Sequence, residues 1–550
     1  MRPEIGRGGL TVGHLLWRMG HLFSGKKYWT ADDSRNMVCR TYGDLLAMSA
    51  QYAAVLTQAA PQPGACIATL AWNHDRHLGV ILATSAVGDV VVPLNPRSSV
   101  EHLHHVLAKV PISVLVFDAD LADLAHSLRA HAGGEMTLLR SGAAAPDCDC
   151  PGLDELATSQ PTSFDWPMLD ENRPMLVSYT SGTTGMPKGV VYSHRSQMLH
   201  AMMALGVDTL GVCEADVVLP AAAFFHANSQ GLPYAALLAG ASMVLPGRRA
   251  GDGPFLAELV ESYKVTCFGA VPTVVHRVAE VLRSAGTPTP LAGTRMISGG
   301  SAVDRALVDR VADLGGQMIQ VWGMTETSPI AAVSRPRGWL DPESSRHSQS
   351  AQGVPVAGVE FELRDLETQE PVEWNGRSTG ELNCRGPWII NDYLWGDWQG
   401  ESHDWLGTGD VASIDESGYM RIVDRLKDLV KSGGEWIATR RLEEAILQVD
   451  GVVECAVVGI PHPEWGERPV AYVVARECAD VDSLGARIRS ALVGSVPKFW
   501  LPDDVRVLDR LPRTPNEKID KMALRRAMDV PPADQAAGSA AGRPEGAARP

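Results

Sequence analysis

The sequence has few cysteines, and they are not arranged as a disulfide framework or a metal site requires. Its 550 residues include nine cysteines, an odd number, scattered from Cys39 to Cys478. Only Cys148 and Cys150 lie close together, and neither a CxxC pair nor another metal-ligand spacing occurs. We therefore interpret these two cysteines as incidental and predict a protein of a reducing compartment, the cytoplasm.

The chain also lacks a long unbroken apolar run. Its most apolar stretch, residues 78–94, is interrupted by Thr84, Ser85 and Asp89, and falls short of the roughly 18 apolar residues that a spanning helix needs. The opening residues, MRPEIGRGGL, contain no apolar signal region. We expect neither a membrane span nor export.

Positive charge is in deficit, which argues against nucleic acid as a partner. The 49 Lys and Arg residues and 65 Asp and Glu residues give a net charge of −16. Such a balance repels a phosphate backbone unless the basic residues are segregated. With 45% hydrophobic residues, the chain nevertheless has enough apolar material for more than one domain.

The order of apolar and amphipathic segments predicts a large layered α/β domain over residues 1–424. Between residues 40 and 320, short apolar runs alternate with longer amphipathic or Ala/Leu-rich segments. We interpret the apolar runs as buried strands, and residues 81–94, 113–117 and 176–179 are examples.

A charged segment marks the end of this domain. Residues 424–434, DRLKDLVKSGG, end in a glycine pair and precede the helix-like pattern ATRRLEEAILQV. β-rich runs follow at residues 452–460 and 470–474, so we predict a small mobile α+β lid domain over residues 425–530. Residues 531–550 are rich in Ala, Gly and Pro and are predicted to form a disordered tail.

A loop rich in glycine and hydroxyl groups follows the apolar run MLVS. Residues 179–190 read YTSGTTGMPKGV, and the backbone N–H groups and hydroxyls of such a loop can bind phosphate oxygens. It is not a Walker loop, because Gly182, Gly185 and Lys188 do not follow the GxxxxGK[ST] spacing. The loop therefore predicts a phosphate-binding site of another kind.

This loop resembles the phosphate loop of the adenylate-forming superfamily, which contains acyl-CoA synthetases, peptide synthetase adenylation domains and beetle luciferases. Further matching motifs occur in the same order as in that family: GGSA at 299–302, VWGMTETSP at 321–329, GELNCRGPWI at 380–389, TGD at 408–410, DRLKDLVKSGGEW at 424–436 and LPRTPNEKIDK at 511–521. The resemblance spans residues 40–528. The segments FFHANSQGLPYAALLAGASMVLPG and KSGGEWI look most similar to bacterial medium- and long-chain fatty acyl-CoA synthetases.

The resemblance implies an AMP-forming acid–thiol ligase. In that family a carboxylate attacks the α-phosphate of ATP, pyrophosphate leaves, and the thiol of CoA then displaces AMP from the acyl-adenylate. The implied ligands are ATP or acyl-AMP, Mg²⁺, CoA and a hydrophobic carboxylic acid. The residues implied to bind the nucleotide are Thr180, Ser181, Gly182, Thr183, Thr184, Gly185, Lys188, Gly300, Ser301, Ala302, Trp322, Gly323, Thr325, Asp410 and Arg425.

The resemblance also assigns roles within this set. The loop from Thr180 to Lys188 holds the pyrophosphate, and Glu326 with the Thr180 hydroxyl binds Mg²⁺, a cation that prefers oxygen ligands. Asp410 grips the ribose hydroxyls. Trp322 stands where the family usually has Tyr, so stacking on adenine is retained but the phenol is lost.

For the acyl group, the implied residues are His226, Asn228, Gln230, Gly299, Gly300, Gly323 and Met324. The His226 position carries Asp in amino-acid-activating domains, so an α-amino acid here would bury an unpaired charge. Gln230 replaces a Trp that gates the fatty-acid tunnel of related enzymes. The sequence leaves open a straight-chain acid and a bulky terpenoid- or polyketide-like acid.

The segment after residue 424 resembles the pivot and the thiol site of the family. Lys427 or Asp428 is implied as the pivot of the small domain. Ser432, Gly433 and Gly434 are implied to border the pantetheine tunnel of CoA. Lys431 either assists there or is a surface charge.

The last motif departs from the family pattern. The residues implied to be catalytic are Lys518, His226 and Lys431, but Glu517 precedes Lys518 where the family commonly has Gly. This loses the left-handed backbone conformations that glycine allows, and the carboxylate can pair with Lys518 or repel the triphosphate. Besides a complete ligase, one hypothesis is therefore an enzyme that takes preformed acyl-AMP from a partner adenylating ligase and forms only the thioester.

Two further alternatives stay open. One is an enzyme that loads the acyl group onto a carrier-protein thiol, and the other is a degenerate nucleotide-binding protein without activity. A homodimer is an expectation from the resemblance alone.

Overall fold

The computed structural model describes residues 9–32, 34, 36–143, 148–180, 186–229, 231–341, 344, 348–390, 393–394, 405–476, 481–513 and 519–527, without the side chains of residues 228, 481 and 482. The contacts between Cα atoms divide the chain into two units, Met1–Leu426 and Lys427–Pro550. The division falls within the charged segment where the sequence predicts a boundary after residue 424. The predicted tail, residues 531–550, lies outside the described residues.

The first unit contains a six-stranded sheet with the strand order β6-β5-β3-β4-β7-β8. Its strands are β3 (Cys66–Leu70), β4 (Val90–Pro93), β5 (Ile112–Asp118), β6 (Thr137–Ser141), β7 (Pro174–Tyr179) and β8 (Gly189–Ser193). Neighbouring strands are parallel except β7 and β8, which are antiparallel.

Helices cover both faces of this sheet because successive residues of a strand point to opposite sides. Val114 and Val116 of β5 pack with α2 (Tyr42–Ala59), α3 (Asp75–Val87) and α6 (Leu153–Ala157). Leu115 and Phe117 pack with α4 (Val100–Lys109) and α5 (Ala122–His131) on the other face.

A nine-stranded sheet follows the order β15-β14-β13-β12-β11-β9-β10-β1-β2. Its strands are β1 (Lys27–Ala31), β2 (Met37–Thr41), β9 (Val217–Pro220), β10 (Ser242–Leu245), β11 (Cys267–Ala270), β12 (Arg295–Ser298), β13 (Gln317–Gly323), β14 (Ile330–Ser334) and β15 (Val354–Pro355). The strands from β1 through β10, β9, β11 and β12 to β13 are parallel to one another, which brings the carboxyl ends of β9, β11, β12 and β13 to one edge.

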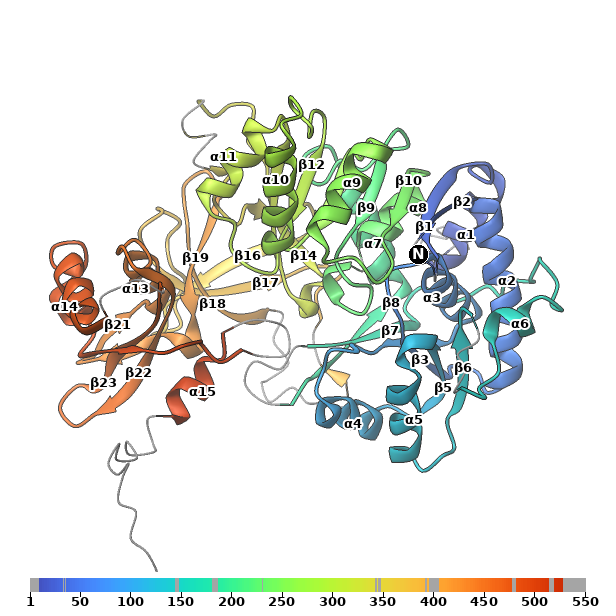
Figure 1. Cartoon of the computed structure of the whole chain (residues 1–550), viewed down its shortest axis with the longest axis horizontal. Coiled ribbons are helices and arrows are strands. Elements are labelled where there is room, and N and C mark those ends of the chain that lie inside the picture. The colour runs from blue at the N-terminus through green and yellow to red at the C-terminus, as the bar shows by residue number, and fades with distance from the viewer. Residues whose placement is uncertain are drawn as a thin grey trace, which may run out of the picture. The chain divides into compact units, whose positions relative to one another are not determined.

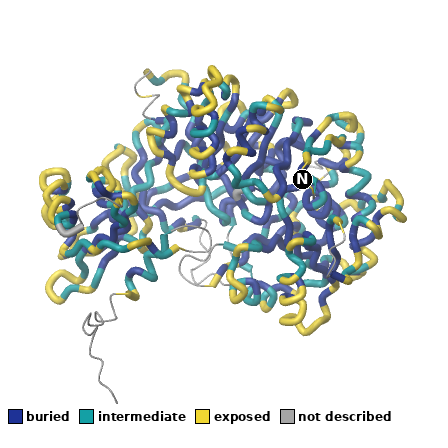
Figure 2. Tube along the Cα trace, in the orientation of Figure 1, coloured by how far each residue is buried: buried dark blue, intermediate teal, exposed yellow. Residues whose placement is uncertain are grey.

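Helices also cover both faces of the nine-stranded sheet. On one face lie α9 (Gly253–Tyr263), α10 (Pro272–Ala285) and α11 (Arg305–Asp313), which Figure 1 shows in a row. On the other face lie α1 (Val12–His21), α7 (His194–Leu205) and α8 (Leu232–Ala239), which share one apolar cluster with α3 and the six-stranded sheet. The first unit is therefore layered, and Figure 2 shows much of this interior as buried.

A smaller antiparallel sheet completes the first unit. It consists of β16 (Glu360–Arg364), β17 (Gly380–Arg385), β18 (Leu406–Ile414) and β19 (Met420–Arg425). Short 3₁₀ helices lie at η1 (Ala119–Leu121), η2 (Ala227–Ser229), η3 (Thr325–Thr327) and η5 (Leu426–Asp428).

The second unit has a mixed sheet with the order β21-β20-β23-β22, to which β24 adds in parallel beside β23. Its elements are β20 (Val430–Ser432), β21 (Glu435–Ile437), α13 (Thr439–Ile446), β22 (Val452–His462), β23 (Gly466–Ala475), α14 (Val481–Leu492), η6 (Lys498–Trp500), β24 (Asp504–Val507) and α15 (Lys521–Arg526). α13 and α14 bury Leu442, Leu484 and Ile488 against the sheet.

The predicted fold class is confirmed for both units. One predicted strand is wrong: the apolar run at residues 81–94 contains the second half of helix α3 and then β4. α3 is buried on nearly every side, so its sequence shows no polar face to reveal a helical period. Gly88, with φ 89°, ends the helix in the left-handed conformation that favours glycine. No helix in the described ranges combines the length and the apolarity needed to cross a membrane.

Candidate functional site

The predicted phosphate loop connects β7 to β8, and hydrogen bonds close its base. Thr180 N donates to the Lys188 carbonyl (2.9 Å), and Lys188 N donates to Thr180 Oγ1 (3.1 Å). These two bonds continue the β7–β8 ladder by one step, so the loop leaves and re-enters the sheet at one point. Ser181, Gly182, Thr183, Thr184 and Gly185 lie outside the described residues.

Beside the loop base, an aromatic side chain links Lys188 to Glu326. Lys188 Nζ lies 4.8 Å from the centre of the Tyr393 ring, and the Tyr393 hydroxyl donates to Glu326 Oε1 at 2.6 Å. Glu326 is 6% exposed. The pKa of the Tyr393 phenol is raised well above its usual range, mainly because the phenol is buried and also because the Glu326 carboxylate is close. The phenol therefore keeps its proton and stays a donor, holding one oxygen of Glu326 in place.

A second buried carboxylate is held from two sides. Trp322 Nε1 donates to Asp410 Oδ2 at 3.0 Å, and Arg425 Nε lies 2.5 Å from Asp410 Oδ1. Asp410 and Arg425 face each other across β18 and β19, and Trp322 comes from β13 of the nine-stranded sheet. Asp410 is 2% exposed whereas the Arg425 side chain is 47% exposed, so a buried carboxylate is paired with a half-exposed cation. Each of its oxygens can still accept another hydrogen bond.

An apolar pocket lies at the carboxyl ends of the parallel strands of the nine-stranded sheet. These strands contribute Pro220 from β9, Ala270 from β11, Ile297 from β12 and Val321 from β13. Open α/β sheets bind ligands at this edge. The pocket encloses about 60 Å³ and is lined mainly by apolar atoms.

Glycines shape the pocket by leaving space for the backbone of neighbouring strands. A Cβ on Gly299 would lie 2.6 Å from the Val321 carbonyl oxygen, and one on Gly323 would lie 1.7 Å from the Pro329 carbonyl oxygen. Both glycines and Gly300 line the pocket, as the sequence predicts. A side chain at either of the first two positions would displace backbone rather than merely narrow the pocket.

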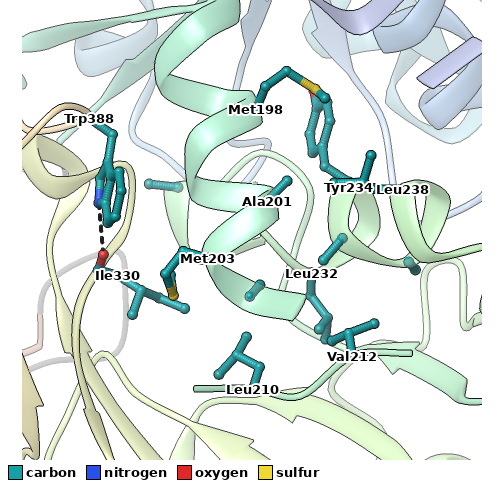
Figure 3. Close-up of a cluster of buried hydrophobic side chains, with 14 of the residues drawn as sticks. Met198, Ala201, Met203, Leu210, Val212, Leu232, Tyr234, Leu238, Ile330 and Trp388 are labelled. Carbon is teal, nitrogen blue, oxygen red and sulfur yellow. Dashed lines mark hydrogen bonds between the residues drawn. The ribbon is translucent and has the colours of Figure 1, made fainter. Parts of the chain in front are cut away.

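The pocket wall on the side of α7 and α8 belongs to the main apolar cluster. Leu210, Leu232 and Ile330 line the pocket, and Figure 3 shows them with Met203 among the packed side chains of this cluster. Trp388 Nε1 donates to the Ile330 carbonyl at 3.1 Å, which fixes this part of the wall.

Two buried polar atoms near this wall have no hydrogen-bond partner in the part of the chain that the structure describes. Ser229 lines the pocket, is 3% exposed, and its Oγ is unpartnered. His200, on α7, accepts from Ile330 N at its Nε2 (3.2 Å), whereas its Nδ1 is unpartnered. Burial lowers the pKa of His200 to about 3, so the ring is neutral and Nδ1 carries the hydrogen.

Of the other residues predicted for the acyl site, the described His226 and Met324 are not in the pocket lining. His226 packs its ring edge-to-face on Phe225, with ring centres 4.8 Å apart, and it lies before η2. Met324 begins the turn into η3 and accepts at its carbonyl from Thr327 N. The side chain of Asn228 and the whole of Gln230 lie outside the described residues.

Other residues predicted to bind the nucleotide lie next to the carboxyl ends of β12 and β13. Ser301 and Ala302 follow β12 and are exposed. The Thr325 carbonyl accepts from the Tyr192 hydroxyl at 2.7 Å, which anchors η3 beside the end of β13.

In the second unit, the residues predicted for the thiol site form a tight turn between β20 and β21. Ser432 is 3% exposed and its Oγ accepts from Arg468 Nη1 at 3.0 Å. Gly433 (φ 62°) and Gly434 (φ 91°) both adopt the left-handed conformation, and a Cβ on Gly433 would lie 2.7 Å from the Trp465 ring. Lys431 Nζ lies 4.9 Å from the centre of the Trp436 ring.

The predicted pivot is held by the last helix of its own unit. Arg525 of α15 donates to the Lys427 carbonyl at 3.0 Å and lies 3.4 Å from Asp428 Oδ1. Glu517 and Lys518 lie outside the described residues.

Tyr393 and Ser229 are the site residues that sequence reasoning missed. Tyr393 lies 67 residues after Glu326 and far from Lys188 in the chain, so no local spacing links the three. Ser229 stands in the quoted segment FFHANSQG, but the sequence does not show that its hydroxyl lacks a hydrogen-bond partner among the described residues.

Comparison with known proteins adds independent evidence. The AMP-binding enzyme family matches residues 33–394, and the AMP-binding enzyme C-terminal domain matches residues 441–518.

Individual relatives cover nearly the whole chain. The 3-methylmercaptopropionyl-CoA ligase of Ruegeria pomeroyi is 36% identical over 481 residues, which are 86% of this chain and 88% of that protein. The medium-chain-fatty-acid–CoA ligase of Ectopseudomonas oleovorans is 34% identical over 538 residues, 96% of this chain and 97% of that protein. The crystal structure of ATP-bound MatB from Rhodopseudomonas palustris has a TM-score of 0.78 and 26% identity, and the match covers 94% of this chain and 99% of that one.

Proposed function

Since the chain belongs to the AMP-binding enzyme family, we propose that it joins a hydrophobic carboxylic acid to CoA through an acyl-adenylate, as an AMP-forming acid–thiol ligase. One observation carries this proposal. On β13, Val321 and Gly323 line the apolar pocket, while Trp322 between them donates to the buried carboxylate of Asp410. One strand can thus contact both parts of an acyl-adenylate, the apolar acyl chain and the polar nucleotide.

The reaction has two balanced steps. In the first, an acid carboxylate oxygen forms a bond to the α-phosphorus of ATP, and the bond to the bridging oxygen breaks as pyrophosphate leaves. In the second, the sulfur of CoA bonds to the acyl carbon, AMP leaves with the former carboxylate oxygen, and the thiol proton passes to solvent or a base. Negative charge shifts among oxygens in both steps, so fixed cations and donors are the groups expected to stabilise it.

The residues of the first unit divide this work between them. Lys188, held against Tyr393, is in our proposal the cation for the pyrophosphate end. Asp410 accepts from the ribose hydroxyls with its remaining lone pairs while Trp322 and Arg425 hold its position.

Mg²⁺ is the cation that suits the oxygen donors near Lys188. Glu326 offers a buried carboxylate with one oxygen bonded to Tyr393, and Thr180 offers a hydroxyl at the loop base. An all-oxygen donor set of this kind favours a hard cation. When bound with ATP, Mg²⁺ supplies positive charge to the phosphates.

The acid that we propose is short or compact, within the hydrophobic class. The cavity, about 60 Å³ within a mainly apolar lining, favours a small apolar group. The unpartnered Ser229 hydroxyl favours an acyl chain with an atom that can accept a hydrogen bond. The name of the Ruegeria pomeroyi relative indicates a short acid of this kind, a thioether, whereas other relatives act by name on longer fatty acids.

We propose a complete ligase with CoA as the thiol. Lys188, Glu326 and Asp410 are all present, and the relatives at 34–36% identity are named as CoA ligases. The turn at Gly433 and Gly434 leaves its outer side open for a narrow thiol arm, since a Cβ on Gly434 would meet no atom within 4 Å.

The test is a product assay with purified protein, ATP, Mg²⁺ and a panel of acids of increasing length, with and without a chain heteroatom. Each acid is offered with CoA and, separately, with a phosphopantetheine carrier protein, and acyl thioesters are identified by mass spectrometry. Asp410→Asn serves as the negative control. We expect acyl-CoA with pyrophosphate release for the shorter acids. Absence of thioester with every acid and both thiols would overturn the proposal.

A further inference from the structure

One imidazole and two thiols lie close together away from the apolar pocket, on the outer face of the six-stranded sheet. His126 lies on α5, whose Ala125 and Leu128 are buried against the sheet. The His126 ring stands edge-on to the buried Phe117 of β5, with ring centres 6.5 Å apart at 61°. This contact limits the orientations of the imidazole, although the residue itself is exposed.

The two thiols come from the segment that leads from β6 to α6. The chain returns to the end of β6 there. Arg140 N donates to the Pro151 carbonyl at 2.9 Å, and the backbones of Arg140 and Gly152 form an isolated parallel β-bridge. Cys148 and Cys150 immediately precede this anchor and pack against the same apolar cluster as α5. Cys148 is 9% exposed, and neither cysteine is in a disulfide.

The three side chains converge on one point. His126 Nε2 lies 4.0 Å from Cys148 Sγ and 3.7 Å from Cys150 Sγ, and all three atoms lie within 4.8 Å of one another. A tetrahedral Zn²⁺ with bonds of about 2.3 Å to sulfur and about 2.0 Å to nitrogen separates such ligands by about 3.6 Å. The two nitrogen-to-sulfur distances therefore lie within a few tenths of an ångström of those in a metal site.

We propose that His126, Cys148 and Cys150 form a binding site for a thiophilic divalent cation, of which Zn²⁺ is the physiological type. One imidazole nitrogen and two sulfurs select Zn²⁺ over Mg²⁺ or Ca²⁺, which take oxygen ligands. On binding, each thiol gives up its proton to solvent, so two thiolates neutralise the two charges of the ion. Because His126 is exposed, water supplies the fourth ligand.

The sequence conceals this site because the imidazole comes from a helix and the thiols from a loop after the next strand. The spacing, 21 residues between His126 and Cys148 and one between the cysteines, matches no common zinc motif. The metal would fasten the segment before α6 to α5, and we infer that it stabilises the first unit. None of the three ligands lines the apolar pocket, so this inference does not depend on the proposed ligase activity.

The experiment is a metal titration of the reduced full-length protein after treatment with a chelator. Cd²⁺ reports thiolate binding by sulfur-to-metal charge-transfer absorption, and Zn²⁺ affinity is measured against a chromophoric chelator. We expect one ion per chain and a rise in the melting temperature on addition of Zn²⁺. In Cys148→Ser, Cys150→Ser and His126→Asn we expect affinity to fall by at least about tenfold.

Cys213→Ser is the control, because Cys213 is another free cysteine of the first unit and, unlike Cys148 and Cys150, is exposed. It should bind metal as the wild type does. Peptide mapping of iodoacetamide labelling on the wild type serves in case a variant fails to fold: Zn²⁺ should protect Cys148 and Cys150 but not Cys213. Equal labelling of all three with and without Zn²⁺, equal metal binding by variants and wild type, or a Cys148–Cys150 disulfide in place of bound metal would each overturn the site.

Discussion

The candidate active site has a polar end, around Asp410 and Glu326, and an apolar end, which is the pocket. These two ends are built in opposite ways. At the polar end, side chains from separate elements bind one another directly: Trp322 and Arg425 hold Asp410, and Tyr393 holds Glu326. At the apolar end, apolar side chains line the pocket without binding one another, and glycines such as Gly299 and Gly323 let neighbouring backbone pack closely around it.

This difference indicates which end determines the reaction and which end determines the acid. Every contact of the polar end is made by a charged or hydrogen-bonding group with little freedom to change, so that end should act on any acid alike. The wall of the pocket consists of apolar side chains whose size sets the space, so substitutions there should alter which acid is accepted.

The largest effect is expected at Asp410. In Asp410→Asn the shape is kept but the charge is lost, which leaves Arg425 without its partner and weakens the grip on ribose. We expect kcat/KM to fall about a hundredfold or more, by the same factor for short and long acids, in a pyrophosphate-release assay. Glu360→Gln, which breaks an exposed ion pair with Arg385 in the same sheet, should change the rate by less than about twofold. A loss that depends on acid length would contradict the proposal that the polar end acts on all acids alike.

Tyr393→Phe should have the next largest effect. It removes the hydroxyl that donates to Glu326 but leaves the ring face against Lys188. Loss of a hydrogen bond to a charged group costs about 1.5–3 kcal/mol, so we expect kcat/KM for Mg-ATP to fall about ten- to hundredfold. An unchanged rate would mean that the Tyr393–Glu326 bond plays no part in the reaction.

Ala270→Leu tests whether the apolar pocket determines which acid is accepted. Ala270 lines the pocket and is 6% exposed, so a larger side chain there takes space from the acyl chain. Each excluded methylene is worth about 1–3 kcal/mol, so we expect the preference for shorter acids to rise at least about tenfold in competition assays. The rate with the shortest acid should change little. Equal losses for all acids would contradict the role of the pocket.

His200 tests whether the wall behind the pocket is a neutral, buried environment. Its folded pKa of about 3 lies below the unfolded value of about 6.5, so its contribution to stability is complete above pH 6.5 and is lost as pH falls towards 3. His200→Gln, which keeps an acceptor for Ile330 N, removes this dependence. In urea unfolding, the stability difference between wild type and variant should shrink by about 2 kcal/mol from pH 7 to pH 5. A constant difference would show that His200 does not titrate in this way.

Ser229→Ala should have the smallest effect on the rate. The hydroxyl has no hydrogen-bond partner among the described residues, so its removal should not destabilise the protein. We expect kcat/KM to fall about threefold to tenfold for acids with a chain heteroatom and to stay unchanged for plain hydrocarbon acids. Loss with both kinds of acid would rule out recognition of the heteroatom by Ser229.

Local motifs allowed much of this account to be predicted from the sequence. The family and the layered fold are confirmed, because the glycine-rich loop and TGD are continuous segments with recognisable residue orders. Helix α3 was misjudged because complete burial removes the periodic polar face by which a helix is recognised.

Contacts between distant residues could not be predicted in this way. Tyr393 meets Glu326 across 67 residues, and His126 meets Cys150 across 24. Such pairs depend on the packing of whole elements, which no local spacing encodes. The polar end was therefore predicted as a set of residues, but its internal bonds required the fold.

The most direct test of the account asks whether one chain performs both half-reactions. Purified protein is given CoA with either a short acid plus ATP and Mg²⁺ or the matching synthetic acyl-adenylate, and acyl-CoA and AMP are quantified by mass spectrometry. We predict acyl-CoA from both, with one AMP per thioester, and loss of both products in Asp410→Asn. Product from the acyl-adenylate alone, with acids that a control ligase activates, would contradict the account and assign the first step to another enzyme.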